Sequence, residues 1–253
     1  MSGIPAAVGL IRSVLPMLRW YLLTLCSGMV NTGSFIACGW FVSHVTGFAT
    51  LTGISVERNG WVAALSVFTV PLYFLLGSMF SAWMVDTRIS RGLNPLYGFP
   101  LVIVTLLLTA TALAGRSGWF GPFDGDPDPR RHYLMLVMLC LASGIQNAIV
   151  TTATGGILRS SHLTGTTTDL GSGIMRALLM PRGSLERQLE NRLNGLRFGV
   201  IAAFVGGAIA GAFCFAHWQF GGFLLPATIS LLVAVWVSAD HAFGRRRNSS
   251  AQA

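Results

Sequence analysis

Hydrophobic positions along the chain gather into six long blocks separated by shorter polar segments. The blocks cover residues 20–42, 61–84, 97–115, 133–157, 198–217 and 220–239. A helix needs about 20 consecutive apolar residues to cross the hydrocarbon core of a bilayer, and each block is close to that length. The pattern therefore predicts an all-α polytopic membrane protein with six transmembrane helices.

A polar motif occurs twice, at the exits of the first and fourth predicted helices. Residues 43–47 read Ser-His-Val-Thr-Gly, and residues 161–165 read Ser-His-Leu-Thr-Gly. A Ser-Gly-x-x-Asn sequence precedes each copy, ending at Asn31 and at Asn147. Each copy belongs to a set of three helices, and an odd number of crossings inverts the second set. We therefore expect two inverted three-helix repeats, an arrangement found in many transporters.

The expected boundaries follow from this repeat and from the composition of the loops. We expect a cytoplasmic N-terminal segment at 1–19, a first repeat at 20–115, an external loop at 116–132, a second repeat at 133–240 and a basic cytoplasmic tail at 241–253. Within the second repeat, Leu side chains recur at helical spacing among Arg and Glu over about 182–197. That spacing predicts an amphipathic helix resting on anionic lipid head groups. Asp124, Asp126 and Asp128 lack the spacing and terminal Glu of a calcium-binding loop, which favours a solvated turn.

Composition and charge place the chain in a bilayer. Of 253 residues, 53% are hydrophobic and 10% are charged, and the mean hydropathy is +0.63. Soluble domains carry about 25% charged residues. All 17 basic residues are Arg and are spread over the loops, which argues for a lipid partner and against nucleic acid. Most of them fall on the side of the two termini, so we expect both termini in the cytoplasm.

The first and fourth helices are polar in their middles, at Asn31 and Asn147 among others. Lipid does not tolerate such side chains, so they turn toward the bundle or toward a wet cavity. They would either contact a ligand or form hydrogen bonds between helices, and the sequence favours neither.

The two Thr-Gly segments have two interpretations. If the chain unwinds near Gly39 or Gly47, residues 46–50 and 164–168 would fold inward as half-helices whose N-termini attract a small polar or anionic solute. Alternatively, Ser, Thr and Gly simply end one helix and cap the next. The candidate ligand-binding or gating residues are Asn31, His44, Thr46, Gly47, Thr50, Asn147, His162, Thr164, Gly165, Thr168 and Asp169.

Asp169 has an apolar counterpart, Leu51, so any proton coupling would belong to one half only. Inversion would place His44 and His162 on opposite faces, which argues against a shared metal ion. The four cysteines lie within predicted helices without metal-type spacing, and no soluble-enzyme motif is present. We therefore expect no catalytic residue, metal or cofactor, and a protein that is not an enzyme.

Small residues four apart mark two further helices. Gly77 and Ser81 lie on the second helix, and Gly207 and Gly211 on the fifth. Such spacing lets helix backbones approach closely in lipid, so we expect these residues to pack helices, with room for a homo-oligomer.

Three stretches resemble the YoaK family, a group of bacterial six-helix membrane proteins filed under a domain of unknown function. They are the Gly-x-x-Asn of the first helix, residues 41–47 and, above all, residues 161–171, Ser-His-Leu-Thr-Gly-Thr-Thr-Thr-Asp-Leu-Gly. The resemblance extends over nearly all of residues 20–240 and implies an inner-membrane location, but it brings no settled activity or ligand.

Inverted repeats with polar, Gly-broken first helices favour a small-solute transporter or channel-like permease with its ligand near the midplane. The alternative is a membrane sensor, scaffold or partner subunit that transports nothing.

Overall fold

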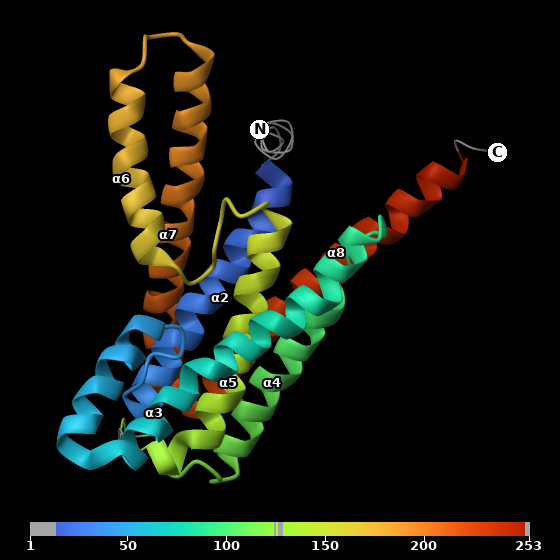
Figure 1. Cartoon of the computed structure of the whole chain (residues 1–253). Coiled ribbons are helices and arrows are strands. Elements are labelled where there is room, and N and C mark those ends of the chain that lie inside the picture. The colour runs from blue at the N-terminus through green and yellow to red at the C-terminus, as the bar shows by residue number, and fades with distance from the viewer. Residues whose placement is uncertain (1–13, 124, 126–128, 251–253) are drawn as a thin grey trace.

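The computed structural model describes residues 14–123, 125 and 129–250. Every regular element in these ranges is a helix, as the sequence predicted (Figure 1). The elements are α2 (Val14–Cys38), α3 (Val45–Ser90), α4 (Gly98–Arg116), α5 (Pro129–Ala153), α6 (Leu163–Leu179), α7 (Leu185–Trp218), the 3-10 turn η1 (Gln219–Phe223) and α8 (Leu224–Ser250). Residues 1–13 of the expected N-terminal segment, Asp124, Asp126, Asp128 and the last three residues of the expected tail lie outside the described residues.

Five helical stretches are long and apolar enough to cross a membrane. They are Met17–Cys38, Val45–Ser90, Gly98–Arg116, His132–Ala153 and Leu185–Asp240, and the last of these contains α7, η1 and most of α8. The chain is therefore a helical membrane protein. The expected tail at 241–253 continues α8 as far as Ser250.

Gly60 divides α3 into two segments. Its φ of 78° and ψ of 173° are not helical, and a positive φ of this kind suits glycine, which has no Cβ. Residues 45–59 run in one direction and residues 61–90 return beside them, so the two segments form a hairpin (Figure 1). The second segment contains the predicted helix at 61–84. The sequence analysis did not predict the helix over 45–59.

The helices α2 and α5 form the centre of the bundle. The most apolar windows of these two helices are each 61% buried, compared with 22% for α3. A buried polar contact joins them, because the Gln146 side-chain amide donates to the Leu23 carbonyl (2.6 Å) and to the Ser27 hydroxyl (2.7 Å). This contact explains part of the polar character that the sequence shows in the middles of both helices.

Each central helix packs mainly on an outer helix that belongs to the other repeat. The main neighbour of α2 is α7, and the main neighbour of α5 is α3. In terms of the sequence repeat, the first helix of each half lies against the second helix of the other half. The helix α4 packs on α8 and on α5.

Glycines stand at both of these crossings. A Cβ at Gly28 would collide with the Phe204 carbonyl of α7, and a Cβ at Gly207 would collide with the Leu25 carbonyl of α2. At the other crossing, Gly144 faces the Phe74 carbonyl of α3. Gly77 faces the Leu141 carbonyl of α5 in the same way. The backbones therefore touch at places where any larger residue would separate the helices.

The other two residues of the small-residue motifs are also buried. Ser81 is 1% exposed, and a Cβ at Gly211 would come within 3.0 Å of the Met29 Cα atom.

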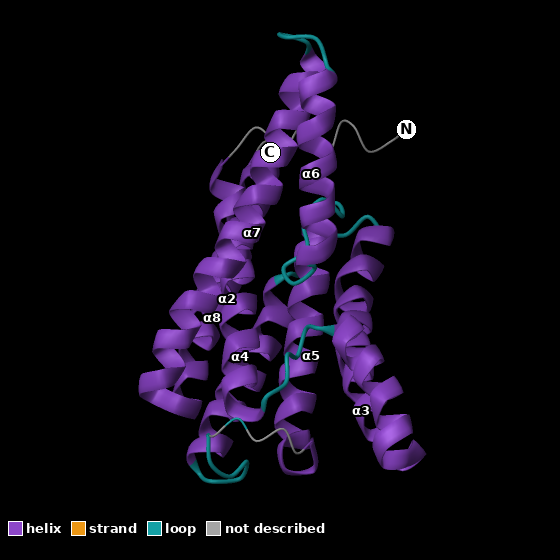
Figure 2. Ribbon diagram, turned by 90° about the vertical axis from the view of Figure 1, so that its left-hand side faces the viewer, coloured by secondary structure: helices purple, strands orange, loops and turns teal. Residues whose placement is uncertain are grey.

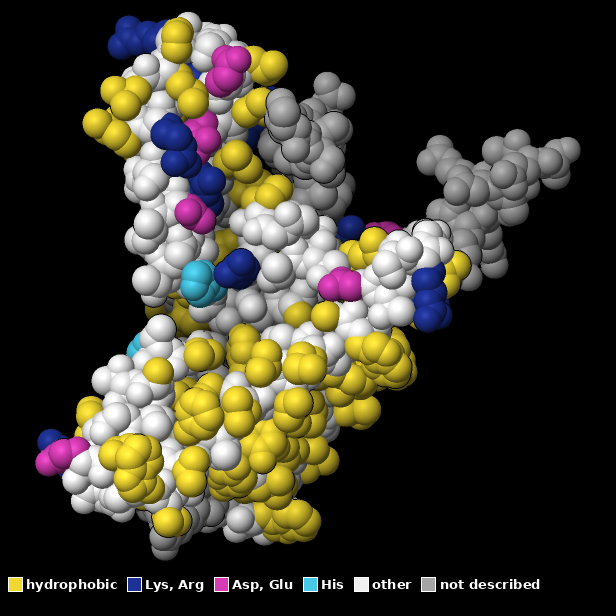
Figure 3. Space-filling model, viewed as in Figure 1, with side chains coloured by type: hydrophobic (Ala, Val, Ile, Leu, Met, Phe, Trp, Pro, Cys, Tyr) yellow, Lys and Arg dark blue, Asp and Glu magenta, His cyan; other side chains and the backbone are white. Residues whose placement is uncertain are grey.

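The segment expected as an amphipathic surface helix, 182–197, is helical from Leu185 onward. It is the first part of α7 and packs beside α6 as a second hairpin (Figure 2). Charged side chains gather over this hairpin, whereas hydrophobic side chains cover the face formed by α3 and α4 (Figure 3).

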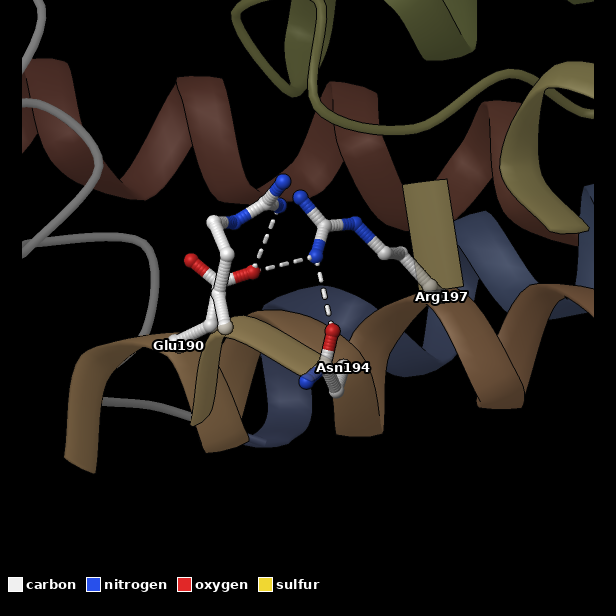
Figure 4. Close-up of polar contacts among 4 residues, drawn as sticks. Glu190, Asn194 and Arg197 are labelled. Carbon is white, nitrogen blue, oxygen red and sulfur yellow. Dashed lines mark hydrogen bonds and ion pairs between the residues drawn. The ribbon is translucent and has the colours of Figure 1, made fainter. Parts of the chain in front are cut away.

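An ion cluster links α6 to α7 within this hairpin (Figure 4). Glu190 accepts from Arg176 and from Arg197, both at 2.9 Å, and Arg197 also donates to the Asn194 side chain at 2.7 Å. Because the Glu190 and Arg197 side chains are only 13% and 15% exposed, solvent screens their interaction less than it screens an exposed pair.

Candidate functional site

The first polar motif is a turn held by an asparagine of the preceding helix. Asn31 lies in α2, and its side-chain oxygen accepts from the Ser43 backbone N–H (3.3 Å) and hydroxyl (3.1 Å). Since a backbone N–H can only donate, the amide oxygen must face Ser43 and the amide NH₂ group must point elsewhere. That NH₂ group makes no hydrogen bond to any residue that the structure describes.

The second motif repeats this arrangement. The side-chain oxygen of Asn147, in α5, accepts from the Ser161 N–H and hydroxyl, both at 3.3 Å, and from the Ser160 hydroxyl at 3.4 Å. Its NH₂ group likewise has no partner within the described ranges. Each asparagine oxygen is therefore committed to its own turn, while each NH₂ group remains available.

The two histidines take the same backbone conformation. His44 has φ −96° and ψ 67°, and His162 has φ −95° and ψ 63°; each is the residue before a helix. The His44 carbonyl accepts from the Phe48 N–H (3.1 Å) and the His162 carbonyl from the Thr166 N–H (3.2 Å). His162 follows Asn147 by 15 residues whereas His44 follows Asn31 by 13, so the two extra residues in the second copy leave the turn itself unchanged.

Each imidazole lies over the glycine three residues further on. A Cβ at Gly47 would collide with the His44 ring, and a Cβ at Gly165 would collide with the His162 ring. Glycine at these positions therefore lets the histidine cover the first turn of its helix. Both histidines remain exposed.

The threonines of the motif lie on exposed helix surface. Thr50 donates its hydroxyl to the Thr46 carbonyl (3.1 Å), and Thr168 donates to the Thr164 carbonyl (3.0 Å). All four threonines are exposed, and so is Asp169 on α6.

The two turns differ in their apolar surroundings. Beside His44 is a small cavity of about 50 Å³ whose lining includes Trp40, Phe48 and Leu51. The Trp40 and Phe48 rings stack with their centroids 5.5 Å apart. At the place equivalent to Leu51 the second half has Asp169, so its turn is the more polar one.

The N-termini of α3 and α6 face each other. In Figures 1 and 2, α6 starts at mid-height and runs upward, whereas the first segment of α3 starts below it and runs downward. Each helix follows a non-helical stretch, 39–44 and 154–162 respectively, with a positive φ at Gly39 and at Gly155 and Gly156. The chain therefore breaks before each Thr-Gly segment and a new helix begins there, with His44 or His162 as the residue before the helix and no side-chain cap on it.

This arrangement can attract an anion or a polar group. Helix N-termini present unpaired N–H groups and a partial positive charge, and they favour negative charge by about 0.3–1 kcal/mol each at exposed sites. The two asparagine NH₂ groups and the two imidazoles supply further donors. Among the described residues, no group of three or more His, Cys, Asp or Glu side chains could hold a metal ion.

Sequence reasoning did not select the serines that bind the asparagines. Ser43 and Ser161 follow Asn31 and Asn147 by 12 and 14 residues, so their place as the first residue of the repeated motif, and not a common spacing, was the signal that could have identified them.

A family model described as "Protein of unknown function (DUF1275)" matches residues 20–236. No curated protein and no solved structure matches the chain. The match agrees with the predicted membrane-protein family without an assigned activity, while the YoaK name itself stays a prediction.

Proposed function

We propose a function for this chain from its geometry, because the chain belongs to the DUF1275 family and that family is described only as one of unknown function. The protein is a small-solute permease or channel of the bacterial inner membrane. Its solute, small and polar or anionic, binds between the N-termini of α3 and α6. The observation that carries the proposal is the pair of equivalent, asparagine-held turns from which these two helices start in opposite directions.

The proposal includes six membrane crossings arranged as two inverted repeats, with both termini in the cytoplasm. Three observations support it. The two turns agree within a few degrees in the backbone of His44 and His162. The helix α2 packs on α7, and α5 packs on α3, so each contact joins the two repeats, and glycines lie at both contacts. A hairpin follows each turn, one in α3 and one formed by α6 and α7.

Solute binding at this place follows from the donors that the fold leaves unpaired. The NH₂ groups of Asn31 and Asn147 and the exposed hydroxyls of Thr46 and Thr164 can all donate, and lipid offers them no acceptor. A solute with negative charge or carbonyl oxygens would satisfy them during its passage. Asp169 would make the cytoplasmic half of the path the less favourable one for an anion.

The test is flux through proteoliposomes of the purified full-length chain, with a panel of chloride, nitrate, formate and acetate as probes. Thr46→Val and Thr164→Val preserve side-chain shape and remove one hydroxyl each, so we expect at least one probe to cross more slowly in both variants. Thr105→Val is the matched control, because Thr105 donates to its own helix at the Leu101 carbonyl and lies in α4. Equal flux in all four proteins would contradict the proposal.

A protein that moves no probe would correspond to the alternative function, a sensor, scaffold or partner subunit. The exposed motif residues of α3 and α6 would then be covered by a second copy or another subunit. Co-purification of a stoichiometric partner, lost on changing His44 or His162, would identify that case.

A further inference from the structure

A cavity of about 680 Å³ has no residue of the two motif turns in its lining. It is bounded by the end of α4, the end of α7, η1 and the start of α8. Ligand pockets in proteins usually measure about 300–1,000 Å³, so the cavity is large enough for a small molecule or a lipid head group.

Three of the polar side chains that line this cavity are Arg116, His217 and Gln219. Arg116 ends α4 and makes no hydrogen bond or ion pair with any residue in the described part of the chain. His217 lies 2.8 Å from the Phe213 carbonyl through Nδ1. Since a carbonyl can only accept, Nδ1 carries the hydrogen of this bond and Nε2 is left for another partner.

Gln219 is the third polar side chain, and its backbone is strained. Its φ of 47° is positive, which holds for no other non-glycine residue that the structure describes. Such conformations cost about 1–3 kcal/mol and cluster at ligand sites and switch regions. The strain turns the chain from α7 into η1, and so it places Gln219 on the cavity wall.

Two exposed tryptophans lie at or beside the cavity. Trp218 lines it and is 65% exposed, and Trp119, just beyond the end of α4, is 73% exposed. Tryptophans gather at the head-group level of membranes, where an apolar ring meets a polar surface. Leu225 and Thr228, in the first turns of the membrane-spanning α8, form the wall on the apolar side and are also exposed.

We infer that this cavity binds a phosphate group, with a phospholipid as its source. The Arg116 guanidinium is a planar fork that matches two phosphate oxygens, and Gln219 supplies a further donor. Because His217 Nδ1 donates to the Phe213 carbonyl, His217 donates to the phosphate through Nε2 only when its imidazole is protonated. The acyl chains of the lipid lie along Leu225 and Thr228. This site is separate from the solute path, so neither inference depends on the other.

The test measures thermal unfolding of the full-length protein in a phosphate-free, non-ionic detergent with three added probes. The probes are dioctanoyl phosphatidylglycerol, dioctanoylglycerol, which has the same chains without phosphate, and inorganic phosphate. We expect the phospholipid to raise the Tm of the wild type and dioctanoylglycerol to leave it unchanged. Arg116→Gln should weaken phospholipid binding by about tenfold or more, since a charge-assisted contact is lost.

Two further variants make the result specific. Arg58→Gln removes an exposed arginine outside the cavity and should bind phospholipid as the wild type does. His217→Gln should weaken binding even if Arg116→Gln fails to fold. Unchanged binding in Arg116→Gln and His217→Gln, or equal stabilisation by dioctanoylglycerol, would overturn the inference. Stabilisation by inorganic phosphate as strong as by the phospholipid would keep the phosphate site and overturn the lipid as its source.

Discussion

At the scale of single residues, Asn31 and Asn147 perform the same structural task in two separate turns. Each uses its side-chain oxygen to hold a serine N–H and hydroxyl, and each keeps its NH₂ group free of any partner within the described chain. The sequence predicted that the two residues are equivalent. It could not distinguish a ligand contact from a hydrogen bond within the protein, because an asparagine side chain has separate donor and acceptor ends that can do both.

Removing either asparagine side chain should destabilise the protein. In Asn31→Ala and in Asn147→Ala a partly buried serine N–H loses its acceptor, which costs about 1–3 kcal/mol. The measurement is thermal or denaturant unfolding of the purified variants. Ser66→Ala is the control, since Ser66 is exposed and donates only to its own helix, and it should change little. Asparagine variants as stable as this control would show that the turns do not depend on these contacts.

The contact of His162 with Gly165 gives a second prediction at this scale. Gly165→Ala should displace the imidazole and lower the free energy of unfolding. The double variant that also carries His162→Ala should lose less of this free energy than Gly165→Ala alone, because the ring that the new Cβ would hit is gone. Gly171→Ala lies in the same helix with nothing near its Cβ position, so it should be neutral or gain about 0.5–1 kcal/mol from reduced chain entropy. If the stability losses of Gly165→Ala and His162→Ala simply add in the double variant, the contact between the imidazole and Gly165 is contradicted.

At the scale of helices, close backbone contact decides which elements become neighbours. The sequence predicted Gly77, Ser81, Gly207 and Gly211 as packing residues, and the structure adds the partners of the three glycines, which lie on α5 for Gly77 and on α2 for Gly207 and Gly211. The partner helices were not predictable, because a pair of small residues indicates a close contact without indicating the helix that makes it. The helix at 45–59 was not predicted either, since its end depends on the left-handed backbone of Gly60.

Two adjacent glycines of α7 test the crossing directly. Gly207→Ala should push α7 away from the Leu25 carbonyl and cost about 1–3 kcal/mol, as overpacking does. Gly206→Ala should be neutral or slightly stabilising, because nothing lies near its Cβ position. Unfolding of the two variants under identical conditions is the measurement, and equal stabilities would argue against a close α2–α7 crossing.

At the scale of the whole molecule, the repeat in the sequence predicted two equivalent turns. In the structure, the helices that follow these turns in the sequence run in opposite directions. The inversion itself rests on the odd number of crossings between the copies, which is a matter of topology rather than of local propensity. Ser, Thr and Gly both break helices and begin them, so the sequence left the fate of these segments open. In the structure a histidine, not a serine, threonine or glycine, is the residue before each of these helices, and its side chain makes no capping hydrogen bond.

The most direct measurement is the sidedness of the two hairpin tips. Single cysteines at Glu57→Cys, near the tip of the α3 hairpin, and at Arg182→Cys, between α6 and α7, can be labelled with a membrane-impermeant maleimide. The four native cysteines are buried and should give little background. We predict that intact cells label the cysteine at residue 57 and that residue 182 reacts only after the inner membrane is permeabilised. Labelling of both residues from the same side would contradict the inverted arrangement.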